Sequence, residues 1–175
     1  ALTHKFAHPP ALQPMHKQLV LRALWWKQRH PGIRVVCAKR DVARAFKWIE
    51  LAPKSVAEFV CTIPGPGGGP EATCLNLTLC FGWSGAPGCY MAAAFAARTH
   101  HEAHAPDAPE RHDAVRYSSE WLMDDSVIVE ADLGTRPWKS CEMLDRSIRL
   151  TWGDKAVNDD KKDEEGEPAT TQLVW

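Results

Sequence analysis

The chain has 175 residues, which is the size of one ordinary domain and excludes an assembly of several large ones. Hydrophobic residues make up 45% of the chain and charged residues 25%, a composition that excludes a disordered or collagen-like protein. No stretch approaches the roughly 18 uninterrupted apolar residues that a membrane-spanning helix needs, so we expect no contact with a membrane.

The net charge of −1 hides an uneven distribution along the chain. Residues 1–50 hold ten Lys and Arg residues against two acidic ones, a net charge of +8, whereas residues 51–150 and 151–175 are acidic. A basic N-terminal third can attract a polyanion such as a nucleic acid. On charge alone, a solvated basic helix explains the same pattern equally well.

The first half of the chain alternates between helix and strand patterns. Apolar residues at near-helical spacing predict a basic amphipathic helix that stops at His30-Pro31-Gly32, and the β-branched run after Gly32 predicts a short strand. Glycine and proline then indicate a loop between two strands. In chain order, we expect a helix over 14–29, a strand over 33–41, short helices over 43–51 and 55–60, a hairpin loop over 64–70 and a strand over 72–81.

The second half predicts a buried helix, a hairpin and a further helix. The hairpin is expected because two apolar runs bracket an adjacent pair of acids. A run of charged residues near the end predicts a solvated loop, and the chain then turns apolar as in an interrupted strand. The expected segments are a helix over 87–99, apolar runs over 115–123 and 126–130, a helix over 138–150, the charge run over 158–167 and the apolar end over 172–175.

Six cysteines occur at irregular spacings and include no Cys-x-x-Cys pair, so the sequence indicates neither a zinc ribbon nor a redox pair. Several of them lie inside apolar runs, where an unpaired cysteine behaves as a small buried hydrophobe. We therefore expect reduced thiols and an intracellular setting, with cytoplasm and nucleus equally compatible. The cysteines are Cys37, Cys61, Cys74, Cys80, Cys89 and Cys141.

Three acidic residues are candidate metal ligands. Asp124 and Asp125 are adjacent like charges at a tight bend, an arrangement that a divalent cation or a cationic partner would stabilise. Asp41 closes a short strand, which pairing within one sheet could bring alongside them. Three carboxylates favour Mg²⁺ or Mn²⁺, and two such ions can support a phosphoryl transfer. Taken alone, Asp41 is equally well explained as a strand-end residue or a helix cap, and an Asp-Asp pair is more often a turn cap than a site.

Histidines and tryptophans offer weaker signals. A zinc-binding helix of a metalloprotease needs Glu directly after the first His of His-Glu-x-x-His, whereas Glu102 stands one place later between His100 and His104. We therefore expect these histidines to be solvent-exposed at a helix end. Trp25 and Trp26 beside an apolar stripe are expected in the core, although tryptophans on a basic helix can also stack on bases.

Three segments, in order, resemble the motifs of reverse transcriptases. Asp41 to Phe46 resembles motif A, Phe81 to Pro87 resembles motif B of retrotransposon polymerases, and Leu122 to Asp125 is similar to motif C. Asn158 with Lys161 is similar to motif D. Asp41 and Asp124 are 83 positions apart, about the spacing of the palm subdomain in that family. The resemblance covers roughly residues 10–175.

The resemblance implies an α+β polymerase palm, in which an antiparallel sheet packs against helices. It implies one partial domain over 1–175, with a basic helical lead-in over 1–32, the palm with motifs A to C over 33–150, and an acidic loop with a truncated strand over 151–175. Most of the fingers would precede residue 1, and a thumb would follow residue 175. The implied activity is RNA-directed DNA synthesis by nucleotidyl transfer within a retrotransposon. The implied partners are an RNA template, a DNA primer, deoxynucleoside triphosphates and flanking polyprotein domains.

The resemblance also implies roles for the charged residues. Asp41 and Asp124 would bind two Mg²⁺ or Mn²⁺ ions, with Asp125 in a supporting position. Lys161 would protonate the leaving pyrophosphate as a general acid.

Apolar residues of the motifs would bind nucleotide and template. Phe46 would lie beneath the deoxyribose and exclude a 2′-hydroxyl, and Phe81 and Gly82 would line the incoming nucleotide and the template. Two positions depart from the family pattern, because Leu122 replaces an aromatic residue and Cys80 replaces a frequent proline.

A second interpretation stays open, namely a non-catalytic nucleic-acid-binding or degenerate retroelement fragment. It predicts salt-sensitive binding that Asp124→Asn leaves unchanged. The polymerase interpretation predicts nucleotide incorporation that requires a divalent metal ion.

Overall fold

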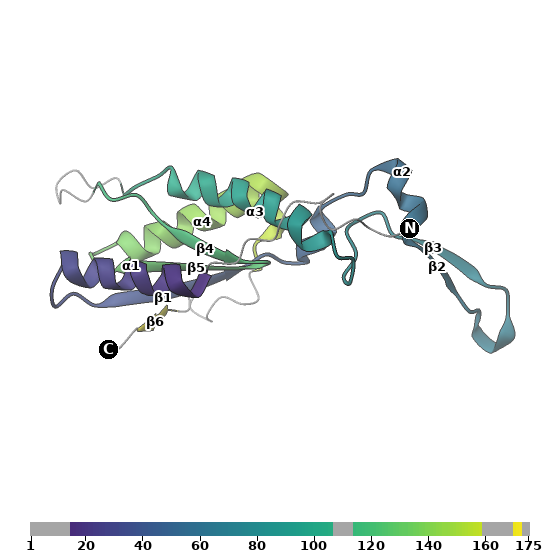
Figure 1. Ribbon diagram of the computed structural model, residues 1–175, viewed down its shortest axis with the longest axis horizontal. Helices are drawn as coiled ribbons and strands as arrows, with labels where there is room; N and C mark the ends of the chain where they lie inside the picture. The colour runs from purple at the N-terminus through teal and green to yellow at the C-terminus, as the bar shows by residue number, and fades with distance from the viewer. Residues whose placement is uncertain (1–14, 107–113, 159–169, 173–175) are drawn as a thin grey trace.

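Four strands form one antiparallel sheet at the centre of the computed structural model, which describes residues 15–106, 114–158 and 170–172 (Figure 1). The spatial order is β4-β5-β1-β6, so the first strand of the chain lies between two strands from its second half. The strands are β1 (Val35–Asp41), β4 (Ser119–Leu122), β5 (Asp125–Ala131) and β6 (Thr170–Gln172). All pairs of neighbouring strands run antiparallel.

Helices cover both faces of the sheet. On one face α3 (Ala86–Glu102) and α4 (Arg136–Trp152) pack against each other and the strands, and α1 (Met15–Arg29) lies on the other face (Figure 1). The alternation of β1 explains this layering, because successive side chains point to opposite faces. Val35 belongs to the core cluster beneath α1, whereas Ala38 belongs to the cluster beneath α3 and α4.

The α1 layer does not extend over the whole sheet. The cluster beneath it contains Trp26, Val35, Val129 and Ala131, all near the beginning of β1 and the end of β5. The side chain of Lys39, further along β1, is exposed. One end of this sheet face is therefore open, and it is the end at which β1 finishes.

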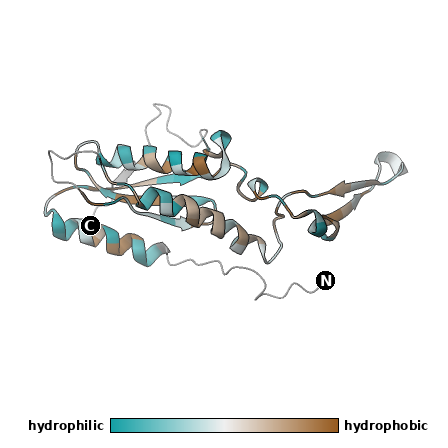
Figure 2. Cartoon of the chain, turned by 90° about the horizontal axis from the view of Figure 1, so that it is seen from above, coloured by the Kyte–Doolittle hydropathy of each residue, from teal (hydrophilic) through white to brown (hydrophobic). Residues whose placement is uncertain are grey.

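A two-stranded ribbon projects from the body as an arm, as Figure 1 shows. It consists of β2 (Val60–Ile63) and β3 (Ala72–Leu75), joined by a loop that contains η4 (Pro66–Gly68), so the predicted hairpin loop is confirmed. A side chain at Gly65 would place its Cβ 2.4 Å from the carbonyl oxygen of Pro70, so the loop closes only around glycine there. Apolar residues colour the ribbon brown in Figure 2, although nearly all of its side chains are exposed.

The prediction of an α+β protein with an antiparallel sheet packed against helices is confirmed. The prediction of a helix over 43–51 is wrong, because only a 3-10 turn, η2 (Ala45–Trp48), forms there. The positive φ angles of Arg44 (61°) and Ala45 (25°) start the turn outside the helical region.

Two further boundaries differ from the prediction. The helix expected over 55–60 is α2 (Pro53–Val56) followed by η3 (Ala57–Phe59), and Val60 already belongs to β2. The strand expected over 72–81 ends at Leu75, and a single bridge between Glu50 and Thr78 follows it. The ribbon therefore continues into the body through irregular chain.

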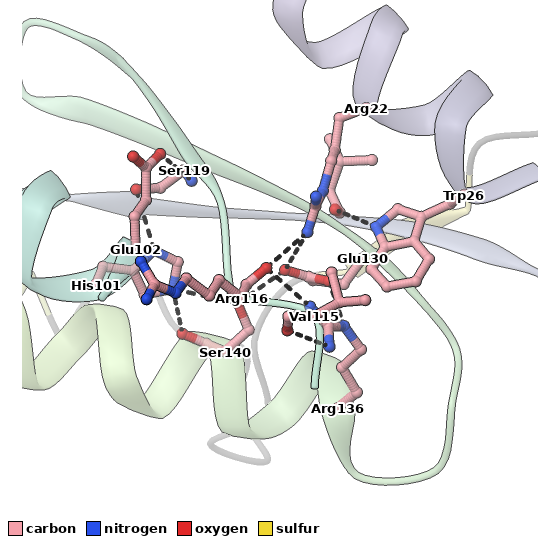
Figure 3. A network of polar contacts seen from close by, with 11 residues as sticks. Arg22, Trp26, His101, Glu102, Val115, Arg116, Ser119, Glu130, Arg136 and Ser140 are labelled. Atoms are coloured by element: carbon pink, nitrogen blue, oxygen red, sulfur yellow. Dashed lines mark hydrogen bonds and ion pairs between the residues drawn. The ribbon is translucent and has the colours of Figure 1, made fainter. Parts of the chain in front are cut away.

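A buried polar network links α4 to the sheet and to α1 (Figure 3). The guanidinium of Arg136 on α4 donates to the carboxylate of Glu130 on β5 and to the carbonyl oxygens of Val115 (3.0 Å) and Arg116 (3.3 Å). Arg22 of α1 approaches the same Glu130 carboxylate at 3.7 Å. Arg136 and Glu130 are both buried, so this ion pair belongs to the core.

The prediction that the α3 histidines are solvent-exposed is wrong. His101 is fully buried, with ring nitrogens 3.2 Å from the hydroxyl of Ser119 and 3.2 Å from the carbonyl oxygen of Ser140 (Figure 3). Burial lowers the pKa of His101 to about 3. His100 is half-buried and bonds to the Ser147 hydroxyl at 2.9 Å. The reason is that α4 and β4 cover this end of α3.

The expectations for the chain end fall largely outside the described residues, because the charge run 158–167 is described only at Asn158 and the apolar end only at Gln172. Within the described residues, no helix has the length and apolar character needed to cross a membrane.

Candidate active site

The end of β1 lies against the turn that joins β4 to β5. Asp41, the last residue of β1, pairs in register with Asp125, the first residue of β5. The backbone N–H of Val42 then donates to the carbonyl oxygen of Asp124 at 3.0 Å. The backbones of all three acids therefore meet at one end of the sheet. The predicted hairpin is present, with Asp124 in its bend and Asp125 as the first residue of β5.

The turn itself is tight. Leu122 and Asp125 are paired residues, so only Met123 and Asp124 form the bend. Met123 has a φ of 55°, a value that the first position of such hairpin turns requires. This geometry keeps Asp124 at the tip, where its half-buried side chain can face a ligand.

The three carboxylates have different surroundings. Asp41 is only 7% exposed and accepts a 2.7 Å hydrogen bond from the side-chain amide of Asn158. Asp125 forms a 2.8 Å ion pair with Lys39, which is on the open face of the sheet. Within the described part of the chain, the carboxylate of Asp124 has no hydrogen-bond or ion-pair partner. Asp124 is therefore the carboxylate most available to a new ligand.

A buried tyrosine lies within electrostatic reach of these acids. Tyr90 of α3 has no exposed surface, and its hydroxyl has no hydrogen-bond partner among the described residues. Its pKa is raised well above the usual range, first by desolvation and then by the negative charges of Asp124, Asp41 and Asp125. A buried hydroxyl without a partner costs about 1–3 kcal/mol. The unsatisfied group therefore lies within electrostatic reach of all three acids.

Aromatic rings join the segment after β1 to the segment before α3. Phe46 packs edge-on against Phe81 (4.8 Å between ring centroids) and against Tyr90 (5.2 Å). Phe46 is buried, whereas Phe81 is 74% exposed beside it. Gly82 has a φ of 87°, which favours glycine at this bend. The predicted site residues Phe46 and Phe81 are thus in contact, and Gly82 adjoins them in the chain.

Tyr90 and Lys39 were not identified from the sequence. Tyr90 shares a helix face with the buried Ala94 and Ala97, so the helical period places it in the core but does not show what its hydroxyl faces. Lys39 lies two residues before Asp41 and therefore on the same face of β1. Lys161, the predicted general acid, lies outside the described residues.

The carboxylates at the end of β1 and at the β4–β5 turn meet only part of what a divalent cation requires. Within residues 15–106, 114–158 and 170–172, no three His, Cys, Asp or Glu side chains are arranged to hold a metal ion. The Asp125 carboxylate already forms an ion pair with the Lys39 ammonium, and this pair competes with a metal ion for that carboxylate. Asp41 and Asp124 still supply hard oxygen donors of the kind Mg²⁺ and Mn²⁺ prefer. The Tyr90 hydroxyl, which has no hydrogen-bond partner among the described residues, lies within electrostatic reach of them.

Comparison with known proteins assigns no family. No protein-family model matches the chain, and no curated protein sequence is similar to it. The chemistry of the site is the remaining guide to function.

Proposed function

We propose that the chain carries the metal-binding centre of a reverse transcriptase palm and catalyses RNA-directed DNA synthesis as part of a retrotransposon. The observation that carries the proposal is the meeting of Asp41 at the end of β1 with Asp124 and Asp125 at the β4–β5 turn. Segments 83 positions apart supply these acids, and the resemblance to the polymerase motifs covers the same residues.

Asp41 and Asp124 would hold the metal ions. Bound there, two divalent cations would stabilise the attacking and the leaving oxygen of a nucleotidyl transfer. Asn158 donates a 2.7 Å hydrogen bond to one carboxylate oxygen of Asp41 and so fixes the orientation of that side chain. Asp125 is paired with Lys39, so it would contribute negative charge near the metal ions rather than bind them directly.

Exposed cations around the acids support a polyphosphate substrate. Lys39, Arg44 and Lys47 all have exposed side chains and lie on β1 or on the turn that follows it. Phe46, between Arg44 and Lys47 in the chain, is buried but packs on the exposed ring of Phe81, so an accessible aromatic ring and positive charge belong to the same region. This combination suits a deoxynucleoside triphosphate, whose sugar is apolar on one side and whose phosphates are anionic.

A non-catalytic nucleic-acid-binding role is the second candidate. The Lys39–Asp125 ion pair and the absence of a three-ligand group in the described residues favour it. In that role the basic surface would bind nucleic acid and the acids would be structural. Binding would then weaken steeply with salt but would need no metal ion.

Mn²⁺ binding in the presence of a deoxynucleoside triphosphate tests the proposal. Water-proton relaxation would report bound Mn²⁺ for the wild-type chain, for Asp124→Asn and for Asp132→Asn. We expect Asp124→Asn to weaken binding at least about tenfold, because it removes a carboxylate that has no partner among the described residues. Asp132→Asn is the matched control, since Asp132 pairs with Arg34 at the opposite end of β5.

Primer extension with an RNA template separates the two candidates. The polymerase proposal predicts Mn²⁺-dependent incorporation that Asp124→Asn abolishes and Asp132→Asn preserves. Equal Mn²⁺ binding by wild type and Asp124→Asn, together with salt-sensitive RNA binding, would instead establish the non-catalytic role.

The variant Lys39→Met tests the role of Asp125. Tighter Mn²⁺ binding would make Asp125 a metal ligand, and unchanged binding would mean that its ion pair with Lys39 has a structural role only.

A further inference from the structure

The ribbon β2–β3 places two cysteines directly opposite each other. Cys61 of β2 and Cys74 of β3 are register partners in the antiparallel pair. Opposite residues of such a pair are about 4.5–5.5 Å apart between Cα atoms. Disulfide bonds span about 4.4–6.8 Å between Cα atoms, so the backbone already has the separation that a disulfide needs.

The two thiols also interact with each other and are accessible. Cys61 is exposed and Cys74 is half-buried, and both are free thiols. The pKa of Cys61 is raised, first by desolvation and then by the charge and the hydrogen bond of Cys74. Side-chain contact across the ribbon therefore accompanies the backbone register.

We propose that Cys61 and Cys74 form a dithiol site that takes disulfide oxidants such as glutathione disulfide and closes into an intramolecular disulfide. The site does not rest on the proposed polymerase function. The four cysteines elsewhere lack such a partner in register: Cys37 and Cys141 are in the body, Cys89 is on α3, and Cys80 bonds to the carbonyl oxygen of Thr78 at 3.6 Å.

The chemistry balances with two molecules of glutathione as products. The Cys61 thiolate attacks one sulfur of glutathione disulfide, that S–S bond breaks, and one glutathione thiolate leaves. The Cys74 thiolate then attacks the Cys61 sulfur of the mixed disulfide and releases the second glutathione thiolate. The two cysteines lose two electrons, glutathione disulfide gains them, and the two protons of the cysteine thiols end on the released glutathiones.

The crosslink would change the order of the arm. The four β2 side chains are exposed and so are three of the four β3 side chains, and the ribbon projects away from the body (Figure 1). A two-stranded ribbon without a hydrophobic face to pack on is marginally stable in water. The thiol form of the arm therefore opens readily, whereas a disulfide would hold β2 and β3 in register.

Thiol mapping tests the site directly. The full chain would be equilibrated with glutathione disulfide, its free thiols blocked with N-ethylmaleimide, and its crosslinks identified by mass spectrometry. We expect one intramolecular crosslink, between Cys61 and Cys74, and stoichiometric binding of phenylarsine oxide to the reduced chain. Cys74→Ser should lose both, whereas Cys80→Ser, the control for the third thiol of this region, should keep both.

Hydrogen exchange tests the consequence for the arm. Oxidation should slow amide exchange over residues 60–75 by at least about tenfold, because the crosslink closes the open states of the ribbon. Exchange in α3 and α4 should stay unchanged. A dominant Cys61–Cys80 crosslink, a lasting glutathione adduct on Cys61 without closure, or unchanged exchange after closure would each overturn the proposal.

Discussion

Replacing Tyr90 with Phe removes one buried oxygen atom and is expected to stabilise the chain in the absence of metal ions. The hydroxyl has no partner among the described residues, and desolvation raises its pKa, with a further contribution from the charges of three carboxylates. The ring contacts stay, because Phe keeps the stacking on Trp152 (5.5 Å) and the edge contact with Phe46 (5.2 Å).

The magnitude follows from the unsatisfied hydroxyl. Leaving such a group buried costs about 1–3 kcal/mol, and the small void left by the missing oxygen offsets part of the gain. We expect a net increase of about 1 kcal/mol in the free energy of unfolding. With a urea m-value of about 2 kcal/mol/M, the unfolding midpoint rises by about 0.5 M.

The advantage of Tyr90→Phe should shrink when a divalent metal ion is present. A ligand that binds only the folded chain stabilises it according to its concentration relative to Kd, and about 2.7 kcal/mol is gained at 100 times Kd. The wild-type chain should gain more from MgCl₂ than Tyr90→Phe does, because the hydroxyl can then bond to the ligand.

Urea unfolding followed by far-ultraviolet circular dichroism, in EDTA and in MgCl₂, measures both effects. Tyr117→Phe is the matched control, since Tyr117 is also buried but stacks on His101 away from the acids. Loss of stability in EDTA for Tyr90→Phe would refute the reasoning about the hydroxyl. An equal increase in the free energy of unfolding by Mg²⁺ in wild type and Tyr90→Phe would show that the Tyr90 hydroxyl takes no part in metal binding.

Three further predictions concern the scaffold. Arg136→Met should cost about 3–5 kcal/mol in urea unfolding because it removes the nearest positive charge from the buried Glu130 carboxylate. Arg136→Met/Glu130→Leu should recover most of the loss, and equal costs would contradict this. The pKa of His101 is about 3 in the folded chain and about 6.5 when unfolded, so the unfolded chain binds the extra proton between these values. Stability should therefore fall from about pH 6.5 towards pH 3 by up to about 1.4 kcal/mol per pH unit from this residue, and parallel unfolding curves for wild type and His101→Gln would speak against it. Phe46→Ala should cost about 3 kcal/mol in the same assay but the exposed Phe81→Ala less than about 1 kcal/mol, and similar losses would show that Phe81 belongs to the core.

Much of the secondary structure could be predicted because its signals are local. The helical period before His30, the β-branched run before Asp41 and the apolar runs around the two acids correspond to α1, β1 and the β4–β5 hairpin. The prediction failed over 43–51, where apolar residues suited a helix but positive φ angles at Arg44 and Ala45 prevent one. It also failed over 72–81, where the strand ends at Leu75 because the chain leaves the ribbon there. Local propensity is weak wherever tertiary contacts set the backbone.

The sequence by itself determined the α+β class, the position of three acids at element ends and the tight turn that carries two of them, because these depend on neighbours within a few residues. Only the tertiary structure decided which distant groups meet. The pairing of β1 with β5 sets Asp41 beside Asp125, and the packing of α3 against the sheet buries Tyr90 near them. Strand register and helix packing join residues tens of positions apart, and their choice depends on how the whole core is filled.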